Sequence, residues 1–243
     1  MNLAIDIGNS FLKIGVFDNE KKLFVESYRD FDAKSLEYLL KEYKIIKAIC
    51  SSVRREDESI ENMLGEAGIS LHKLSHTSRL PFRSLYETPR TLGTDRIAAL
   101  AFGYNKYPGS NVLLIDAGTA VTYDLLNESG IFEGGNISPG IGLRYRALNE
   151  FTGRLPLVSP DNKYDILGRN TENAIRSGVQ QGLVFEINEY IRNLKKTHRN
   201  LKIVMTGGDG IYLSGKTEHK VSYEKDLVIE GLNYILIYNA QVF

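Results

Sequence analysis

The stretch LAIDIGNS at residues 3–10 returns as LLIDAGTA at residues 113–120. In both copies a short apolar run ends in an aspartate, a turn of small residues follows, and a second apolar run comes next, at residues 11–17 and 121–126. Apolar runs of this length on either side of a glycine turn are typical of two strands joined by a tight turn. Because the unit occurs twice, the sequence indicates a fold built from two similar halves.

The turns of the two copies have the composition of anion-binding loops. Gly8 and Gly118 carry no Cβ and can take positive φ, so backbone N–H groups can approach a bulky anion closely. Short polar side chains that can hydrogen-bond to phosphate oxygens follow these glycines at Asn9, Ser10 and Thr119. One copy alone could be an ordinary hairpin with an Asp-x-Gly turn. The repetition at matching positions favours two turns that bind one nucleotide from both sides.

Charged residues accompany both turns. Lys13 follows the first turn closely, where a positive charge can meet a phosphate. Asp6 and Asp116 cannot bind phosphate directly, because like charges repel, but they can hold the metal ion or water that accompanies it.

The composition excludes some classes of protein. The chain has 243 residues with 30 basic and 30 acidic side chains, so no net field attracts nucleic acid or an anionic membrane. No apolar run is long enough to cross a membrane, and no basic segment opens the chain, so we expect neither a membrane span nor a signal peptide. The single cysteine, Cys50, cannot pair within the chain, and a cytoplasmic location is the default expectation. A break at residues 107–110 predicts two α/β domains, residues 1–110 and 111–243.

A second polar stretch ends in Gly93-Thr94-Asp95-Arg96, directly before an amphipathic helical pattern. We expect Thr94 to be the N-cap, which places Asp95 in the first turn among free N–H groups. The helix dipole stabilises a carboxylate there, and this would be enough to explain Asp95 alone. It does not explain Gly93, Arg96 and the preceding Tyr86. Gly93 would be a flexible point, Asp95 a base and Arg96 a cation. This combination suits a substrate that has a hydroxyl and an acidic group.

The second half of the sequence offers further helix starts. We expect Ser138 to be an N-cap with Pro139 at the first helical position. Thr171 is expected to cap a long amphipathic helix. Residues 202–205 predict a strand that ends in a glycine turn, where the backbone could pass close to an adenine or a ribose.

Two other patterns in the sequence are weaker. Residues 210–217, GIYLSGKT, fit the phosphate-loop pattern G-x-x-x-x-G-K-[ST], which requires a helix directly after its last two residues. An alternating pattern follows instead, so we expect a short helix and a turn. His72 and His76 have the spacing of two metal ligands on a helix, but turn-forming residues surround them and no third ligand lies near, so we expect a loop.

Taken in order, these motifs resemble those of the type III pantothenate kinase family. Each motif is weak alone, but the ordered set covers the chain from residue 6 to about 210 and is highly specific. The one departure is Ser10, where the family usually has a threonine, and the hydroxyl is kept. The matching segments are residues 6–10 with Lys13, 86–89, 93–96, 116–120, 134–140, 170–178 and 206–209.

The resemblance implies a fold and a reaction. The fold would be the duplicated ribonuclease-H-like fold of the acetate kinase, sugar kinase, heat-shock chaperone and actin superfamily, with two similar domains of mixed sheets flanked by helices. The reaction would be transfer of the γ-phosphoryl group of ATP to the primary hydroxyl of pantothenate, the first step of coenzyme A biosynthesis. Family members also form homodimers, and they use a divalent metal ion with ATP, here magnesium, and a monovalent cation, potassium or ammonium.

The resemblance also implies roles for individual residues. Asp95 would be the general base, and Asp116 would ligate the monovalent cation. Pantothenate would be bound by Tyr86, Gly93, Thr94, Asp95, Arg96 and Thr171. ATP would be bound by Asp6, Ile7, Gly8, Asn9, Ser10, Phe11, Leu12, Lys13 and Thr119.

Two alternatives stay open at this point. One is a kinase or phosphatase of the same superfamily with another acceptor. The other is a nucleotide-binding regulator without catalysis, against which stands Asp95, since a pure sensor needs no base.

Overall fold

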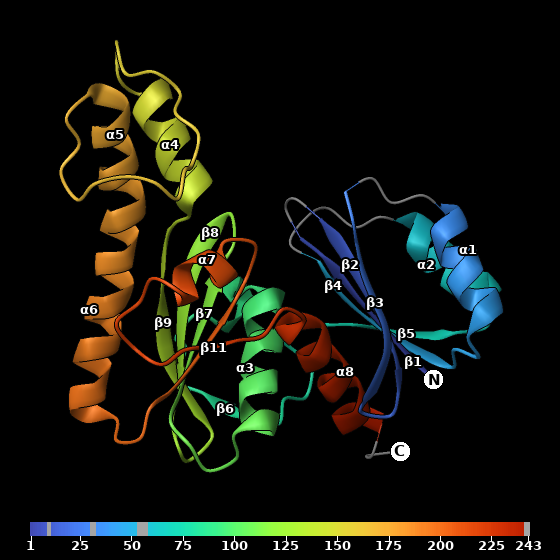
Figure 1. The fold of residues 1–243 in the computed structure, drawn as a ribbon. Helices are drawn as coiled ribbons and strands as arrows, with labels where there is room; N and C mark the ends of the chain where they lie inside the picture. The colour runs from blue at the N-terminus through green and yellow to red at the C-terminus, as the bar shows by residue number, and fades with distance from the viewer. Residues whose placement is uncertain (9–10, 30–32, 53–57, 241–243) are drawn as a thin grey trace. The chain divides into compact units, whose positions relative to one another are not determined.

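The computed structural model describes residues 1–8, 11–29, 33–52 and 58–240, which form two compact units (Figure 1). Unit 1 consists of Met1–Gly109, Glu128–Gly134 and Asp226–Phe243, and unit 2 consists of Ser110–Asn127 and Gly135–Lys225. The chain therefore passes from one unit to the other several times. The division into domains 1–110 and 111–243 stays a prediction.

Unit 1 contains a five-stranded sheet with the order β3-β2-β1-β4-β5. Strand β1 pairs antiparallel with β2, and β2 pairs antiparallel with β3, whereas β1–β4 and β4–β5 are parallel. The strands are β1 (Asn2–Ile7), β2 (Leu12–Asp18), β3 (Lys21–Tyr28), β4 (Lys47–Ser52) and β5 (Ser70–Lys73).

Helices cover both faces of this sheet. Large apolar side chains alternate along β1 and β2, so they lie on one face. Leu3, Ile5, Ile14 and Val16 pack with the apolar faces of α1 (Ala33–Glu42) and α2 (Glu58–Glu66) in one core. The opposite face packs on α8 (Leu227–Ala240), which also contacts α3 (Thr94–Lys106).

Two glycines explain how closely these layers approach each other. A Cβ on Gly15 would lie 2.4 Å from Ile229 Cγ2, and a Cβ on Gly231 would lie 1.9 Å from the Ala98 carbonyl oxygen. Helix α8 can therefore lie against both β2 and α3, and residues near the first turns of α3 and α8 meet. This arrangement brings the starts of both helices to the sheet.

Unit 2 repeats the strand order of unit 1. Its strands belong to a six-stranded sheet with the order β11-β10-β7-β8-β9-β6. Without the edge strand β6, and read from the β9 side, the order is third, second, first, fourth and fifth strand, as in unit 1. Strand β7 pairs antiparallel with β8 and parallel with β10, and β10 pairs parallel with β11. The strands are β7 (Val112–Ala117), β8 (Ala120–Leu126), β9 (Ile131–Pro139), β10 (Lys202–Thr206) and β11 (Ser222–Tyr223). The predicted duplication of a mixed α/β sheet is confirmed.

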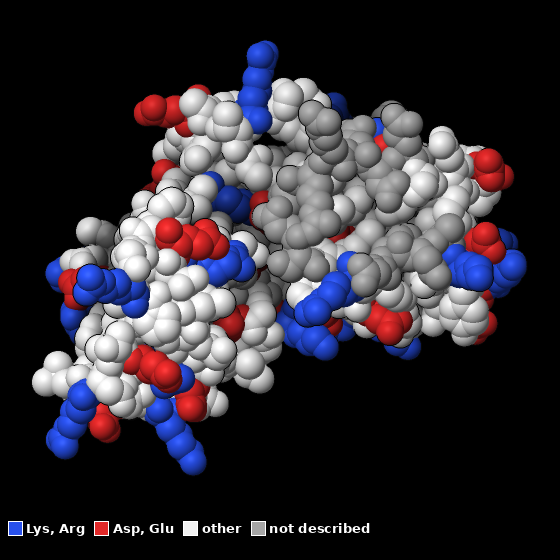
Figure 2. Space-filling model, turned by 90° about the horizontal axis from the view of Figure 1, so that it is seen from above, with Lys and Arg blue, Asp and Glu red and all other residues white. Residues whose placement is uncertain are grey.

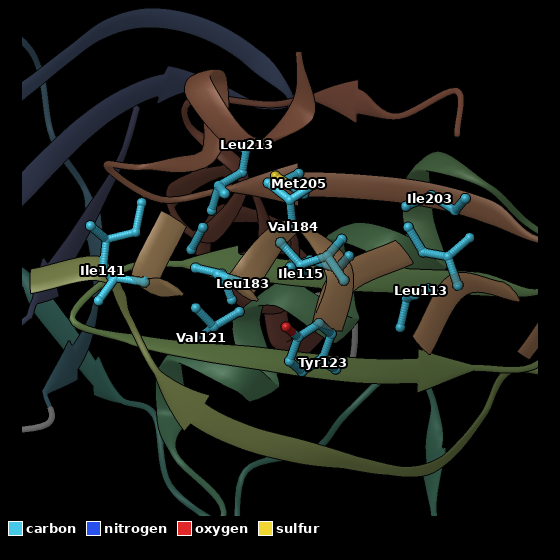
Figure 3. Packing of buried hydrophobic residues seen from close by; sticks show 14 of the residues in the cluster. Leu113, Ile115, Val121, Tyr123, Ile141, Leu183, Val184, Ile203, Met205 and Leu213 are labelled. Atoms are coloured by element: carbon cyan, nitrogen blue, oxygen red, sulfur yellow. The ribbon is translucent and has the colours of Figure 1, made fainter. Parts of the chain in front are cut away.

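Helices of unit 2 cover this sheet through a large apolar core (Figure 3). Tyr123, Ile115 and Met205 from the sheet meet Leu183 and other apolar residues of the long helical segment. That segment contains α5 (Thr171–Arg176), a π-helical turn (Ser177–Gln181) and α6 (Gly182–Thr197). Helices α4 (Ile141–Glu150) and α7 (Gly210–Ser214) complete the unit.

The predicted helix starts are each wrong by one or more residues. Helix α3 begins at Thr94 itself, with Gly93 as the N-cap. Helix α5 begins at Thr171, and Asn170 caps it by accepting a hydrogen bond from the Asn173 N–H at 2.9 Å. An asparagine satisfies a free N–H at a helix start at least as well as a threonine, which explains the shift.

The predicted start of α4 is also wrong. Ser138 and Pro139 are the last residues of β9, and Gly140 is the N-cap of α4. The Ser138 hydroxyl accepts a hydrogen bond from Arg144 Nη2 at 2.8 Å. The side chain expected to cap the helix is therefore bound by a residue of that helix.

The two weaker patterns resolve as follows. Helix α7 ends at Ser214, and strand β11, not a helix, follows the Lys216-Thr217 pair, so residues 210–217 do not form a phosphate loop. His72 lies in β5 rather than in a loop, with Nε2 2.9 Å from Ser78 Oγ. Across the described ranges, no three His, Cys, Asp or Glu side chains gather in a group that could hold a metal ion.

Two observations concern the surface and the lengths of the helices. On the face shown in Figure 2, basic and acidic side chains are interspersed wherever the atoms are not grey. Within residues 1–8, 11–29, 33–52 and 58–240, no helix has the length and apolar character that spanning a membrane requires.

Candidate active site

The candidate site residues of unit 1 lie at one end of its sheet. Asp6 near the end of β1 faces Lys13 on β2 and Ser51 on β4 in the strand registers. Residues in register point to the same face of a sheet. This is the face that packs on α8, because Gly15, two residues beyond Lys13, contacts it.

Asp6 is a buried carboxyl group with an unusual pKa. Its Oδ1 is buried and has no hydrogen-bond partner within the described part of the chain. Burial, and then the charge of Asp95, raise the pKa of Asp6 from 3.8 to about 6, while a hydrogen bond from Ser51 and the charge of Lys13 act in the opposite direction. A carboxylate held in this way favours a cation or a proton next to it.

The first turn of α3 brings Asp95 to this group. Ser51 Oγ and Thr94 Oγ1 lie 2.9 Å apart, within hydrogen-bond distance. The Arg96 N–H donates to Asp95 Oδ1 at 2.8 Å, so one carboxylate oxygen folds back over the helix start. A Cβ on Gly93 would lie 2.3 Å from this oxygen. Gly93 is therefore needed as the space for the Asp95 carboxylate.

An aromatic pair holds the neighbouring cation. Arg96 is buried, and its guanidinium carbon lies 5.5 Å from the centre of the Tyr86 ring and 5.9 Å from that of Phe132. The two rings stack with centroids 5.7 Å apart. Phe132 reaches this place because β6 (Arg83–Ser84) pairs with the first residues of β9. Tyr86 and Arg96, predicted as substrate residues, thus form one side-chain group.

The first turn itself is partly described. The Gly8 N–H donates to the Phe11 carbonyl oxygen at 3.0 Å, which closes the turn. Ile7 and Leu12 are half-buried at the strand ends, and Phe11 is exposed with the Arg29 guanidinium 5.5 Å from the ring centre. Asn9 and Ser10, both predicted to bind ATP, lie outside the described residues.

In unit 2, the turn after Asp116 is enclosed by backbone. The Gly140 N–H donates to the Thr119 carbonyl oxygen at 3.0 Å, and the Asp209 N–H donates to the Ala117 carbonyl oxygen at 3.0 Å. Gly207 has a φ of +90°, and a Cβ there would lie 2.5 Å from Asp116 Oδ1. The glycine turn after β10, expected from the sequence, therefore packs directly on the Asp116 carboxylate.

A charged group supports the same turn from behind. Arg144 Nε donates to the Pro139 carbonyl oxygen at 2.7 Å, and its guanidinium pairs with Glu186, which accepts a hydrogen bond from the Tyr123 hydroxyl at 2.9 Å. Because Pro139 directly precedes Gly140, these contacts fix the strand end that holds Thr119.

The predicted site residues thus divide between the two units. Asp6, Lys13, Tyr86 and Gly93–Arg96 lie in unit 1, whereas Asp116, Thr119 and Thr171 lie in unit 2. Thr119 and Thr171 have exposed side chains.

Three residues of the site were not predicted from the sequence: Ser51, Phe132 and Asp226. Ser51 lies next to Asp6, Phe132 stacks on Tyr86, and Asp226 lies 3.6 Å from the Lys13 ammonium. Ser51 had a sequence signal, because it comes at the end of an apolar run, as Asp6 does. Phe132 and Asp226 had none that single-sequence patterns could supply.

Comparison with solved structures first identifies the fold of this chain. A solved structure described as a putative 2-dehydro-3-deoxygalactonokinase from Sinorhizobium meliloti matches with a TM-score of 0.60 at 12% identity, covering 100% of this chain and 99% of that chain. At this identity the match shows the fold alone, and it is the two-sheet fold of sugar kinases and actin-like ATPases.

The family follows from closer relatives. The model of the type III pantothenate kinase family matches residues 2–193. A type III pantothenate kinase of Bacteroides fragilis (strain YCH46) is 41% identical over 240 residues, which are 98% of each chain. The chain belongs to the type III pantothenate kinase family. A solved structure from Campylobacter jejuni, described as a conserved putative Baf family transcriptional activator, matches with a TM-score of 0.62 at 26% identity and covers 98% of this chain and 99% of that chain.

Proposed function

We propose that the protein transfers the γ-phosphoryl group of ATP to the primary hydroxyl of pantothenate, giving 4′-phosphopantothenate in the first step of coenzyme A biosynthesis. The observation that carries this proposal is the convergence of Asp6, Ser51, Thr94 and Asp95 at one end of a sheet, next to Lys13, in a member of this kinase family.

In this mechanism the protein chiefly positions the reactants and neutralises charge. Phosphoryl transfer passes through a loose transition state whose charge lies on the phosphoryl oxygens. The first turn, Asp6 to Lys13, binds the phosphates together with Thr119 of the second turn. Lys13, which faces Asp6 across β1 and β2, supplies a point positive charge.

Asp95 acts as the general base. The pantothenate hydroxyl gives its proton to the Asp95 carboxylate as its oxygen bonds to the γ-phosphorus, and the bond from that phosphorus to the bridging oxygen breaks to release ADP. The Arg96 N–H fixes Asp95 Oδ1, so the carboxylate is oriented before the substrate arrives. Tyr86, Gly93, Thr94, Arg96 and Thr171 bind the rest of pantothenate.

Two cations belong to this proposal. Magnesium accompanies ATP, and the buried Oδ1 of Asp6, which has no hydrogen-bond partner within the described part of the chain, suits a hydrated cation held mainly by phosphates and water. Bound there, magnesium would neutralise charge on the phosphates. Asp116, whose carboxylate lies against the glycine turn after β10, would hold potassium or ammonium.

We also propose a homodimer in the cytoplasm. Exposed large apolar side chains support dimerisation: Phe151, Leu157, Ile166 and Leu167 are each more than 60% exposed in the segment between α4 and α5. Sedimentation equilibrium tests this, and a monomer at every protein concentration would contradict it.

The test of the activity is an assay that detects the product directly. The purified protein is incubated with ATP, magnesium and pantothenate in potassium, ammonium or sodium salts, and the product is identified by mass. We expect phosphopantothenate with potassium or ammonium and little with sodium alone. Binding of ATP without any product would contradict the proposal.

A second candidate is a nucleotide-binding regulator, favoured by the name of the Campylobacter jejuni structure. A third is a kinase with another acceptor. The same assay separates them, because a panel of alcohols and sugars reports any other acceptor, and ATP binding without turnover on any of them supports the regulator.

A further inference from the structure

A chain of charged side chains connects Lys13 to the start of α8. The Lys13 ammonium lies 3.6 Å from Asp226 Oδ1. On its other side, Asp226 Oδ2 accepts a hydrogen bond from the Lys22 ammonium at 2.8 Å, and that ammonium also lies 2.8 Å from Glu230 Oε1. All four residues belong to unit 1.

Asp226 is the most buried member of this chain of charges. Its side chain is 12% exposed, against 24% for Lys13 and 42% for Lys22. Burial lowers the pKa of Lys22, but hydrogen bonds to Asp226 and Glu230 outweigh it and raise the pKa overall. The Lys22 ammonium therefore stays charged and fixes one oxygen of the Asp226 carboxylate.

The other oxygen is the informative one. Asp226 Oδ1 is buried and has no hydrogen-bond partner in the described ranges, while the Lys13 ammonium lies just beyond hydrogen-bond distance. The ion pair between Lys22 and Glu230 at the surface does not explain why Asp226 Oδ1 is buried next to Lys13. The contact attracts Lys13 electrostatically without a directional hydrogen bond that would have to break when Lys13 moves.

We propose that Asp226 is a positioning residue that holds the Lys13 ammonium ready for the phosphates of the nucleotide. A lysine side chain has four rotatable bonds, and ordering it opposes binding. The Asp226 carboxylate restricts Lys13 before ATP arrives, and because their 3.6 Å contact is longer than a hydrogen bond, Asp226 releases the ammonium to a phosphate oxygen at little cost. This inference rests on the proposed role of Lys13 in binding ATP.

The position of Asp226 in the chain supports this role. Asp226 is the first residue after the chain returns to unit 1, and its carbonyl oxygen accepts the Glu230 N–H at 2.9 Å, the first bond of α8. The backbone of Asp226 is thus fixed by the helix start, and its side chain by Lys22. Because both the backbone and the side chain of Asp226 are fixed, its carboxylate can restrict the position of the flexible Lys13 side chain.

The test is the variant Asp226→Asn, which keeps the shape and the helix-capping ability of the side chain and removes its charge. We expect KM for ATP to rise about tenfold, the order of the cost of ordering a lysine, with kcat and KM for pantothenate changed less than twofold. Isothermal titration with ATP gives the same comparison without turnover, so a failure of the proposed reaction is distinguishable from a failure of this inference.

Two further variants separate positioning from stability. Glu230→Gln removes the outer partner of Lys22, which does not pair with Lys13, and should leave KM for ATP unchanged. In a Lys13→Met background, Asp226→Asn should have no further effect on ATP affinity. In the native background, Asp226→Glu keeps the carboxylate and should keep most of the native ATP affinity. If Asp226→Asn does not fold in thermal denaturation, Asp226→Ser takes its place, because serine also caps a helix. An unchanged ATP affinity, or an equal loss with and without Lys13, would overturn the proposal.

Discussion

Replacing the buried carboxylate Asp6 with asparagine should stabilise the protein at neutral pH while it impairs the kinase. The folded state holds the Asp6 pKa at about 6, against 3.8 for an unperturbed group. A raised pKa means that the ionised form is disfavoured in the folded state relative to the unfolded chain. The cost is absent below about pH 4, grows between about pH 4 and 6, and is complete above that range.

The size of this cost follows from the two pKa values. Each pH unit between them corresponds to about 1.4 kcal/mol, so the ionised carboxylate lowers the free energy of unfolding by about 3 kcal/mol above pH 6. The pKa of about 6 already includes the opposing hydrogen bond from Ser51, so nothing further is subtracted for its loss. We therefore expect Asp6→Asn to raise the free energy of unfolding by about 3 kcal/mol at pH 7.5.

The assay is urea denaturation of the nucleotide-free protein at half-unit steps from pH 4 to pH 8. The difference between Asp6→Asn and the native protein should be near zero at pH 4 and complete at pH 7. Asp18→Asn, at the exposed end of β2, is the control for loss of one acidic charge. Asp95→Asn removes the second cause of the raised pKa, so it should reduce the pH dependence only in part.

Two results would refute this reasoning. If Asp6→Asn were less stable than the native protein at pH 7.5, the carboxylate would contribute net stability through its hydrogen bonds. If it were more stable by the same amount at every pH, the gain would come from shape and not from charge.

The remaining predictions concern the reaction and the second turn. Asp95→Asn should lower kcat by about 10²-fold or more with KM for both substrates nearly unchanged, and near-normal turnover in steady-state assays would remove Asp95 from the role of base. Asp116→Asn should abolish activation by potassium, so an unchanged potassium titration would contradict that assignment. Gly140→Ala should lose activity and about 1–3 kcal/mol of stability in urea denaturation, because its Cβ would lie 2.2 Å from the Gly118 carbonyl oxygen. Gly142→Ala, where the Cβ meets open space, is the matched control and should resemble the native enzyme.

The fold could be predicted because its information is local and occurs twice. An apolar run, an aspartate and a glycine turn define β1–β2 and again β7–β8, and the same strand order follows in both units. The duplication restricts the possible topologies in a way that one copy would not.

The helix starts could not be placed so well, for a physical reason. Sequence rules look for a side chain that can accept a hydrogen bond from a free N–H. At α3 and α4 the N-cap is a glycine, chosen because neighbouring atoms leave no room for a Cβ. Thr94, the expected cap of α3, lies within hydrogen-bond distance of Ser51 instead. This tertiary contact is invisible in the local pattern.

The candidate site shows the same limit. Asp6, Lys13 and Asp95 stand out in the sequence because short motifs surround them. The residues that determine their state are distant in the chain: Ser51 on the parallel strand, and Asp226 more than 200 positions beyond Lys13. Their contribution depends on strand register and helix packing, which a single sequence does not specify.

The strand registers also give a reason to expect a monovalent cation in only one of the two units. In both units the strand register places a hydroxyl beside the aspartate on the parallel strand, Ser51 for Asp6 and Thr206 for Asp116. Across the antiparallel pair the two units differ, because Lys13 faces Asp6 whereas the neutral Thr122 faces Asp116. Unit 1 therefore carries its own ammonium group next to the turn that follows Asp6. A potassium or ammonium ion at Asp116 would supply the corresponding charge in unit 2, and ammonium should serve well because it has the charge and the N–H donors of the lysine that unit 1 uses.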